Sequence, residues 1–183
     1  MRNDIHISEM KGCKETVKFF LAVLLAHSFV SCIGKRNIAH IDFNSLAKAG
    51  MKLGIEIAEN DNHALFQEAA QWVGTPYKYG GNTKDGIDCS GLTCRIYERV
   101  YGIRLPRSSE QQYRTATHIN TQKKSMKQGD LMFFRSSKSG NKCSHVGIYL
   151  KNKLFIHCSS SRGVIVERID GVYWNDKWIG SSH

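Results

Sequence analysis

Three side chains of this sequence have the chemistry and the setting of a nucleophilic active site. Cys89 follows Asp88 at the start of a helix-like stretch, while His145 and His157 lie in two later stretches rich in β-branched and aromatic residues. A helix N-terminus stabilises a thiolate, and a neighbouring imidazole can take the thiol proton and later pass it to a leaving amine. These residue types predict that Cys89 is a nucleophile and that His145 is its base.

The two histidines can be placed relative to each other by the hairpin that joins their strands. The polar run 151–153 suggests a turn centred on Lys151, which sets residue 145 opposite residue 157. Side chains directly opposite in an antiparallel pair lie roughly 5 Å apart on one face of the sheet. We therefore expect His157 to hydrogen-bond the far nitrogen of His145 and to fix its tautomer. We also expect the helix that begins at Cys89 to pack against this face.

The elements that must hold these residues follow from apolar periodicity and capping signals. Helices are expected at 44–53 with Asn44 or Ser45 as the cap, at 63–73, at 89–101 ending at Gly102, and from Ser108 towards Arg114. Short strands are expected after them, at 131–135, 144–150, 153–159, 163–169 and 173–180. Helices followed by antiparallel strands indicate an α+β domain.

The first 31 residues are expected to be an export signal rather than part of the fold. Lys11, Lys14 and Lys18 precede a short apolar run over 19–26, which is too short to span a membrane as a helix. The run ends at Phe29-Val30-Ser31-Cys32, which resembles a bacterial lipobox and predicts lipidation of Cys32. We expect three parts: a lipoprotein signal at 1–31, a tether with a short helix at 32–62, and a catalytic domain at 63–183.

The charge of the chain favours an anionic partner. Its 26 lysine and arginine residues exceed its 16 acidic residues, which gives a formal net charge of +10. An exported basic protein meets cell wall and lipid head groups, and no zinc-finger spacing or arginine-rich helix indicates nucleic acid. We expect a monomer that is held at a bacterial membrane by its lipid, faces the periplasm or cell wall, and needs no metal or other cofactor.

Six segments together resemble the NlpC family of cell-wall cysteine peptidases, in order and over residues 63–180. They are Gly74-Thr-Pro-Tyr-Lys-Tyr-Gly-Gly, Gly86-Ile-Asp-Cys-Ser-Gly, Arg104-Leu-Pro-Arg-Ser-Ser, Gln128-Gly-Asp-Leu-Met-Phe-Phe, Ser144-His-Val-Gly-Ile-Tyr-Leu and Phe155-Ile-His-Cys-Ser-Ser-Ser. The resemblance implies a papain-like core, in which a helix bearing the cysteine packs on an antiparallel sheet. It also implies hydrolysis of peptidoglycan stem peptides or muropeptides, typically between γ-D-glutamate and a following diamino acid.

The same resemblance implies roles for particular residues. Cys89, His145 and His157 match the family's catalytic triad, and Tyr77 matches a tyrosine whose hydroxyl assists at the oxyanion. The residues that match the family's substrate groove are Asp88, Ser90 and Ser108. From the residues alone, Tyr79 competes with Tyr77, and Asp88 can equally be the N-cap of its helix.

Three other functions compete with a peptidase. A zinc site could draw on Cys89, Cys143, His145, His157 and Cys158, although adjacent strand residues such as His157 and Cys158 face opposite ways. A non-catalytic wall-binding module, or an amidase or acyltransferase, could use the same fold. We expect Cys143 on the catalytic face if its strand extends that far, and Cys158 as a buried thiol on the opposite face. A disulfide between these two, or one using Cys94, is not expected.

Overall fold

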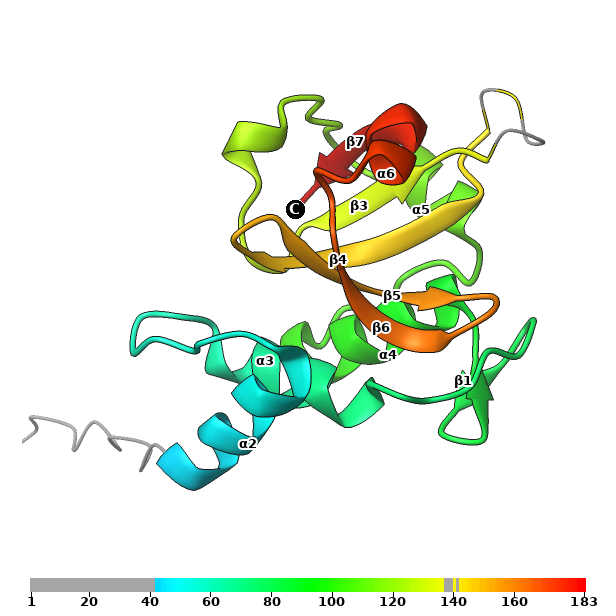
Figure 1. Cartoon of the computed structure of the whole chain (residues 1–183). Coiled ribbons are helices and arrows are strands. Elements are labelled where there is room, and N and C mark those ends of the chain that lie inside the picture. Colours follow the sequence, from blue (N-terminus) through cyan, green and yellow to red (C-terminus); the bar gives the residue numbers. More distant parts are fainter. Residues whose placement is uncertain (1–41, 137–139, 141) are drawn as a thin grey trace, which may run out of the picture. The chain divides into compact units, whose positions relative to one another are not determined.

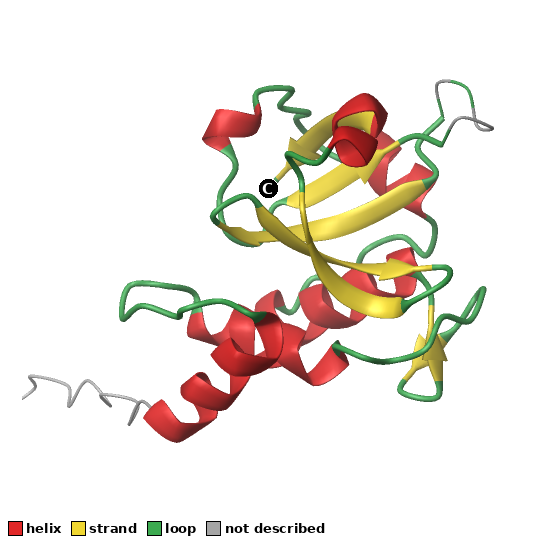
Figure 2. Ribbon diagram, in the orientation of Figure 1, coloured by secondary structure: helices red, strands yellow, loops and turns green. Residues whose placement is uncertain are grey.

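The computed structural model describes residues 42–136, 140 and 142–183, and residues 42–183 form one compact unit. The helical half comes first, with α2 (Phe43–Leu53), α3 (His63–Trp72), a small hairpin of β1 (Asn82–Thr83) and β2 (Gly86–Ile87), α4 (Cys89–Tyr101), α5 (Ser109–Thr115) and a 3₁₀ turn, η2 (Lys123–Ser125). The second half holds β3 (Leu131–Phe134), β4 (His145–Lys151), β5 (Leu154–Ser159), β6 (Gly163–Arg168), α6 (Val172–Lys177) and β7 (Trp178–Ser182). Figures 1 and 2 show this arrangement, which confirms the α+β class.

Helices α2 to α5 begin at polar caps close to the expected positions. Asp88 caps α4 by accepting a 2.7 Å hydrogen bond from the N–H of Gly91, and Gly102 ends the helix at a φ of 68°. The expected cap of α2 was wrong by two or three residues. Asp42 is the cap, and the N–H groups of Asn44 and Ser45 are the donors that it satisfies.

The strands form an antiparallel sheet in the order β6-β5-β4-β3-β7. Four of the expected strands are confirmed to within two residues, but the segment 173–180 was wrong as a single strand. It begins as helix α6 and becomes strand β7 only at Trp178. Trp174 and Trp178 are one helical turn apart and both pack against the same apolar cluster, so aromatic content alone could not distinguish a strand from a helix here.

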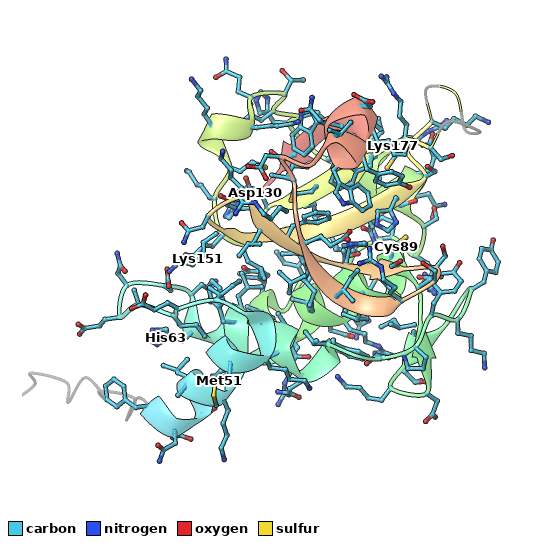
Figure 3. All side chains as sticks on the ribbon, in the orientation of Figure 1. Met51, His63, Cys89, Asp130, Lys151 and Lys177 are labelled. Carbon is cyan, nitrogen blue, oxygen red and sulfur yellow. The ribbon has the colours of Figure 1, made fainter. Side chains whose placement is uncertain are left out.

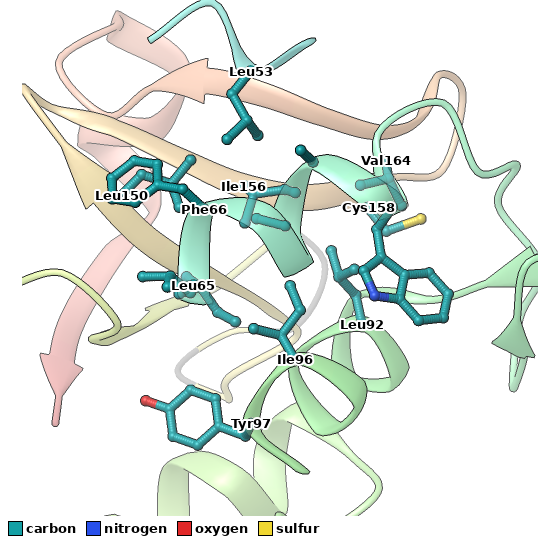
Figure 4. Close-up of a cluster of buried hydrophobic side chains, with 14 of the residues drawn as sticks. Leu53, Leu65, Phe66, Leu92, Ile96, Tyr97, Leu150, Ile156, Cys158 and Val164 are labelled. Carbon is teal, nitrogen blue, oxygen red and sulfur yellow. The ribbon is translucent and has the colours of Figure 1, made fainter. Parts of the chain in front are cut away.

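The two faces of the sheet are covered by different elements (Figure 1). One face carries Val146, Ile148 and Ile156 and packs against the buried residues of α3 and α4, as Figure 4 shows for part of this cluster. The other face carries Phe134 and Phe155 and is covered by α6. Each large side chain that is fully buried in these clusters contributes about 1.5–3 kcal/mol through removal from water.

Helix α2 belongs to the same packed unit, because its residues Ala49 and Leu53 lie in the core cluster beside α3. In the part of the chain that the structure describes, no helix combines the length and the apolar character needed to cross a bilayer.

Candidate active site

His145 and His157 lie on one face of the sheet, as expected, but in a different register. His157 pairs with Gly147, so the expected pairing of residue 145 with residue 157 was wrong by two positions. The turn lies at Asn152 and Lys153, which adopt φ values of 52° and 66°, and an irregularity in the register between Tyr149 and Lys151 precedes it. A shift of two residues preserves the face, since side chains alternate along a strand. The histidines are diagonal neighbours, and Nε2 of His145 lies 3.0 Å from Nδ1 of His157.

Helix α4 does not pack on the histidine face, which corrects the expected arrangement. It lies against the opposite face, where Cys89, the first residue of α4, also packs, while His145 is the first residue of β4. The backbone N–H of Val146, the residue after His145, is near enough to Cys89 to lower the pKa of its thiol. Cys89, His145, His157 and Tyr77 all line one cavity of about 830 Å³ (Figure 3 labels Cys89).

The space for the His157 ring depends on a glycine in the opposite strand. A methyl group on Gly147 would lie 2.8 Å from the carbonyl oxygen of Ile156 and from Cδ2 of Phe155, and 3.1 Å from Cβ of His157. These contacts are closer than packed atoms tolerate, so a larger residue must displace the strand or the ring.

Gly147→Ala should therefore weaken both folding and catalysis. We expect the free energy of unfolding to fall by about 1–3 kcal/mol, as for other overpacked sites. We also expect kcat to fall about 10-fold or more, because His157 is predicted to orient the base and displacement of such a group by about 1 Å is costly. Urea unfolding and steady-state kinetics measure the two effects. Gly171→Ala is the control for the unfolding measurement, since its added methyl group meets only the carbonyl oxygen of Arg168, at 3.7 Å. Equal behaviour of the two variants would contradict the packing argument.

Burial sets the protonation of the resting site. It raises the pKa of the Cys89 thiol, and the N–H of Val146 opposes this only in part. Burial, followed by the proximity of His157, lowers the pKa of His145 to about 3. The resting pair is thus a neutral thiol and a neutral imidazole. These shifts oppose the predicted stabilisation of a thiolate by the helix N-terminus, because desolvation disfavours the charged form of the thiol.

Two residues that sequence reasoning missed complete the surroundings of the histidines. Nε2 of His157 lies 3.0 Å from Oε2 of Glu167, and Nε1 of Trp174 donates to the same oxygen at 3.0 Å. The indole ring of Trp174 stacks on His145, with centroids 5.4 Å apart and planes 23° apart. No motif marks either residue. Only the pairing of His157 with Ile165 across β5 and β6, two residues before Glu167, would have placed that carboxylate near the site.

Tyr77 rather than Tyr79 reaches the cavity. The loop that carries Tyr77 is joined to Ile87 by backbone hydrogen bonds from Ile87 to Pro76 and from Lys78 to Ile87, each 3.0 Å long. Burial raises the pKa of Tyr77, and the neighbouring Cys89 adds to this, so the hydroxyl keeps its proton and can donate a hydrogen bond. Tyr79 is 89% exposed and lies outside the cavity lining.

The residues expected in the substrate groove lie outside the cavity lining. Asp88 accepts hydrogen bonds from Arg107 at 2.8 and 2.9 Å, besides those from Gly80, Ser90 and Gly91. Burial alone would raise the pKa of Asp88, but the bonds from Arg107 and Gly91 lower it, so the carboxylate is ionised and its charge is compensated. Ser108 caps α5 by accepting from the N–H of Gln111.

The described cysteines other than Cys89 have structural surroundings. Cys94, Cys143 and Cys158 are free thiols, as is Cys89. Cys158 is buried as expected and donates to the carbonyl of Ile87 at 3.1 Å. Cys143 is buried in the cluster shared with α4, because β4 begins only at His145 and strand alternation does not extend to Cys143. Within residues 42–136, 140 and 142–183, no three His, Cys, Asp or Glu side chains converge as metal ligands would.

The fold and the cavity together define a papain-like α+β domain with a cysteine and two histidines at one end of its sheet. Residues 74–183, more than half of the chain, match the model of the NlpC/P60 family. The chain belongs to the NlpC/P60 family.

Relatives of this chain include proteins that are named as endopeptidases and hydrolases. It is 44% identical over 125 residues to a probable endopeptidase NlpC homolog of Haemophilus influenzae, a match that covers 65% of this chain and 64% of that relative. It is 37% identical over 114 residues to the murein DD-endopeptidase MepS/murein LD-carboxypeptidase of Escherichia coli K12, covering 62% and 58%. A gamma-DL-glutamyl hydrolase of Bacillus subtilis is 39% identical over 118 residues, covering 63% and 28%. The chain thus spans less than two thirds of the length of each of these relatives.

A solved structure agrees with the fold. A Staphylococcus aureus protein, named as similar to lipoprotein of the NLP/P60 family, superposes with a TM-score of 0.59 and 32% sequence identity, covering 70% of this chain and 42% of that one.

Proposed function

We propose that this protein is a peptidoglycan hydrolase, a cysteine peptidase that cuts the peptide stems of the bacterial cell wall through a Cys89 acyl-enzyme. The observation that carries the proposal is the meeting of Cys89, His145 and His157 in one cavity, with the two imidazoles 3.0 Å apart. A nucleophile, a base and a group that orients the base are the parts that acyl transfer requires.

Each group has a defined step in the proposed reaction. The Cys89 sulfur attacks the peptide carbonyl as its proton passes to Nδ1 of His145, the ring nitrogen that does not contact His157. The imidazolium then gives that proton to the leaving amine, and water hydrolyses the thioester with His145 again as base. The hydroxyl of Tyr77, which keeps its proton, donates to the developing oxyanion.

The charge of the cavity supports an anionic substrate. Arg135, Arg168 and Lys177 line it, and its acidic member Glu167 is itself paired with Arg162. Stem peptides carry several carboxylates, and a cleft of one charge sign concentrates ligands of the other. The guanidinium of Arg168 is paired with Asp170, so Arg135 and Lys177 are the better candidates to contact a substrate carboxylate. In this proposal Asp88, Ser90 and Ser108 contribute to substrate binding from outside the cavity lining.

The bond proposed is the one between γ-D-glutamate and the following diamino acid. The relative named a gamma-DL-glutamyl hydrolase supports this choice, whereas the relative named a murein DD-endopeptidase points to the cross-link between stems. The test is mass spectrometry of the products from two purified substrates, an uncross-linked stem tetrapeptide and a cross-linked dimer.

We expect a dipeptide ending in D-glutamate from the uncross-linked substrate. Amidation of its carboxylates should raise KM several-fold, since exposed ion pairs each contribute up to about 1 kcal/mol. If the protein cleaved only the cross-link, the bond that it cuts would be the D-alanyl bond and not the one proposed. Tight binding of either substrate without cleavage would instead indicate a wall-binding module, and cleavage of other amides only would indicate an amidase.

We further propose that the protein is exported and anchored through a lipid on Cys32, which lies outside the described residues. The lipobox-like sequence before Cys32 supports this. Protein expressed in a bacterial host should partition into the detergent phase, and Cys32→Ala should move it to the aqueous phase. Equal partition of both proteins would contradict the anchor.

A further inference from the structure

The carboxylate of Glu167 lies behind the two histidines and accepts hydrogen bonds from three groups. Oε2 accepts from Nε1 of Trp174 at 3.0 Å and lies 3.0 Å from Nε2 of His157, while Oε1 pairs with the guanidinium of Arg162. Indole and guanidinium groups can only donate, so Glu167 must act as an acceptor on both oxygens. The bond from His157, together with those from Arg162 and Trp174, lowers the pKa of Glu167 to about 2.

An ionised acceptor at this position fixes the direction of each hydrogen bond along the histidines that lie between Glu167 and the thiol. Burial lowers the pKa of His157 and that of His145, so each ring carries one proton at neutral pH. Because Glu167 can only accept, the proton of His157 is on Nε2 and its Nδ1 has a free lone pair. That lone pair must accept the proton on Nε2 of His145, at 3.0 Å. Nδ1 of His145 is then left unprotonated.

We propose that Glu167 is a positioning residue that sets the tautomers of both histidines, so that Nδ1 of His145 is the free base available to Cys89. The inference rests on the proposed function and extends the cysteine and two histidines to a chain of four groups. In the resting state this arrangement changes only which ring nitrogen carries the proton of each histidine. During acylation, the proton from sulfur resides on Nδ1 of His145, and the Glu167 charge stabilises the transient imidazolium through His157.

Helix α6 holds this chain of groups from the side. The ring centroid of Trp174 lies 5.4 Å from that of His145, on which it stacks, and 4.9 Å from that of His157, which it meets edge-on. Its indole N–H donates a hydrogen bond to Glu167. The charged and titratable groups around Glu167 are His157 on β5, Arg162 in the turn before β6, and Arg168 and Lys177 at the cavity wall. The pair of Glu167 with Arg162 is well exposed on the arginine side, so its own contribution to stability is small.

Glu167→Gln tests the direction of these hydrogen bonds. Glutamine offers only one acceptor oxygen at a position where three donors converge. With that oxygen held by Arg162, the amide N–H₂ faces His157 and donates to its Nε2. His157 then carries its proton on Nδ1, His145 accepts on Nε2, and the proton of His145 moves to Nδ1, where it blocks the base. We expect kcat to fall about 100-fold with little change in KM, less than the about 10⁴-fold cost of a wrong tautomer in a serine triad, because here the carboxylate is one group further away.

Three measurements separate this role from a structural one. Nitrogen-15 spectra of the imidazoles should show both histidines protonated on Nε2 in the wild type and shifted toward Nδ1 in Glu167→Gln. The rate of Cys89 alkylation by iodoacetamide at neutral pH should fall with kcat. Glu167→Asp, which restores a carboxylate, should recover part of both rates. Glu98→Gln removes an exposed arginine-paired carboxylate from α4 and should match the wild type throughout.

The outcomes distinguish the positioning role from the proposed function. If the wild type cuts no stem peptide, but the imidazole spectra and alkylation rates change as described, the peptidase proposal fails and the role of Glu167 stands. If Glu167→Gln keeps the wild-type tautomers and a kcat within twofold, the role of Glu167 is overturned whatever the substrate. A wild-type His157 protonated on Nδ1 would overturn it directly.

Discussion

Alanine at Cys89 should abolish hydrolysis of stem peptides and leave the fold intact. The thiol is the only group in the proposed mechanism that forms a bond to the substrate, so its loss should lower kcat by at least about 10⁴-fold. Cys89 lines the cavity at the first turn of α4, and its replacement by alanine leaves in place the hydrogen bond from the N–H of Gly91 to the Asp88 cap. Product formation by mass spectrometry and far-UV circular dichroism measure activity and fold.

Cys94→Ala is the matched control for this prediction. Cys94 is a second free thiol on the same helix, but its sulfur contacts the carbonyl oxygens of Leu105 and Pro106 rather than the cavity. Its loss should cost some stability through packing and should leave kcat unchanged. Full activity in Cys89→Ala, or equal loss in both variants, would rule out Cys89 as the nucleophile.

Features fixed by local interactions could be predicted from the sequence. The start of α4 at Cys89 follows from a side chain that caps the backbone three residues later, and its end follows from a glycine in the left-handed conformation. Both signals act within one helical turn of the residues concerned. The alternation that puts His145 and His157 on one face is equally local, so it remained correct although the register was wrong by two.

The features that failed depend on contacts between distant segments. The hairpin register depends on a turn at Asn152 and Lys153 with positive φ at both residues, and on a bulge that no single residue marks. The face on which α4 packs depends on which side of the sheet provides the larger apolar surface. Periodicity shows that a helix and a strand each have an apolar side, but it does not show that α4 packs on the face of the sheet opposite to the histidines.

The relation of Glu167 and Trp174 to the site illustrates the same limit. Each is unremarkable in its own segment, and the segment holding Trp174 was expected to be a strand. Their roles arise because β6 pairs with β5 and α6 returns over the same face. Family resemblance gave Cys89, His145, His157 and Tyr77, which share the cavity. It did not give the carboxylate behind them, since that contact depends on the pairing of β5 with β6.

His145→Ala should reduce kcat by at least about 10³-fold, since the variant has no base for the Cys89 thiol whose pKa burial raises. His157→Ala should lose less, about 10- to 100-fold, because it removes only the group that orients the base. Stem-peptide kinetics at pH 7 measure both. A smaller loss in His145→Ala than in His157→Ala would show that His157 is the base and would reverse the assignment.

His145→Ala should also make the free energy of unfolding less sensitive to acid. In the folded protein the pKa of His145 is lowered from 6.5 to about 3, so between these values the unfolded chain binds a proton that the folded chain does not. The stabilisation tied to the neutral imidazole is complete above pH 6.5 and is lost as the pH falls toward 3. We expect the wild type to lose about 2–3 kcal/mol of unfolding free energy more than His145→Ala between pH 7 and pH 4. His157 and Glu167, whose pKa values are also lowered, destabilise both proteins in acid, so the comparison isolates His145. Parallel pH profiles of urea unfolding would mean that the pKa of His145 is the same in the folded and the unfolded chain, and a wild type that gains stability relative to His145→Ala as the pH falls would mean that the resting imidazole is protonated.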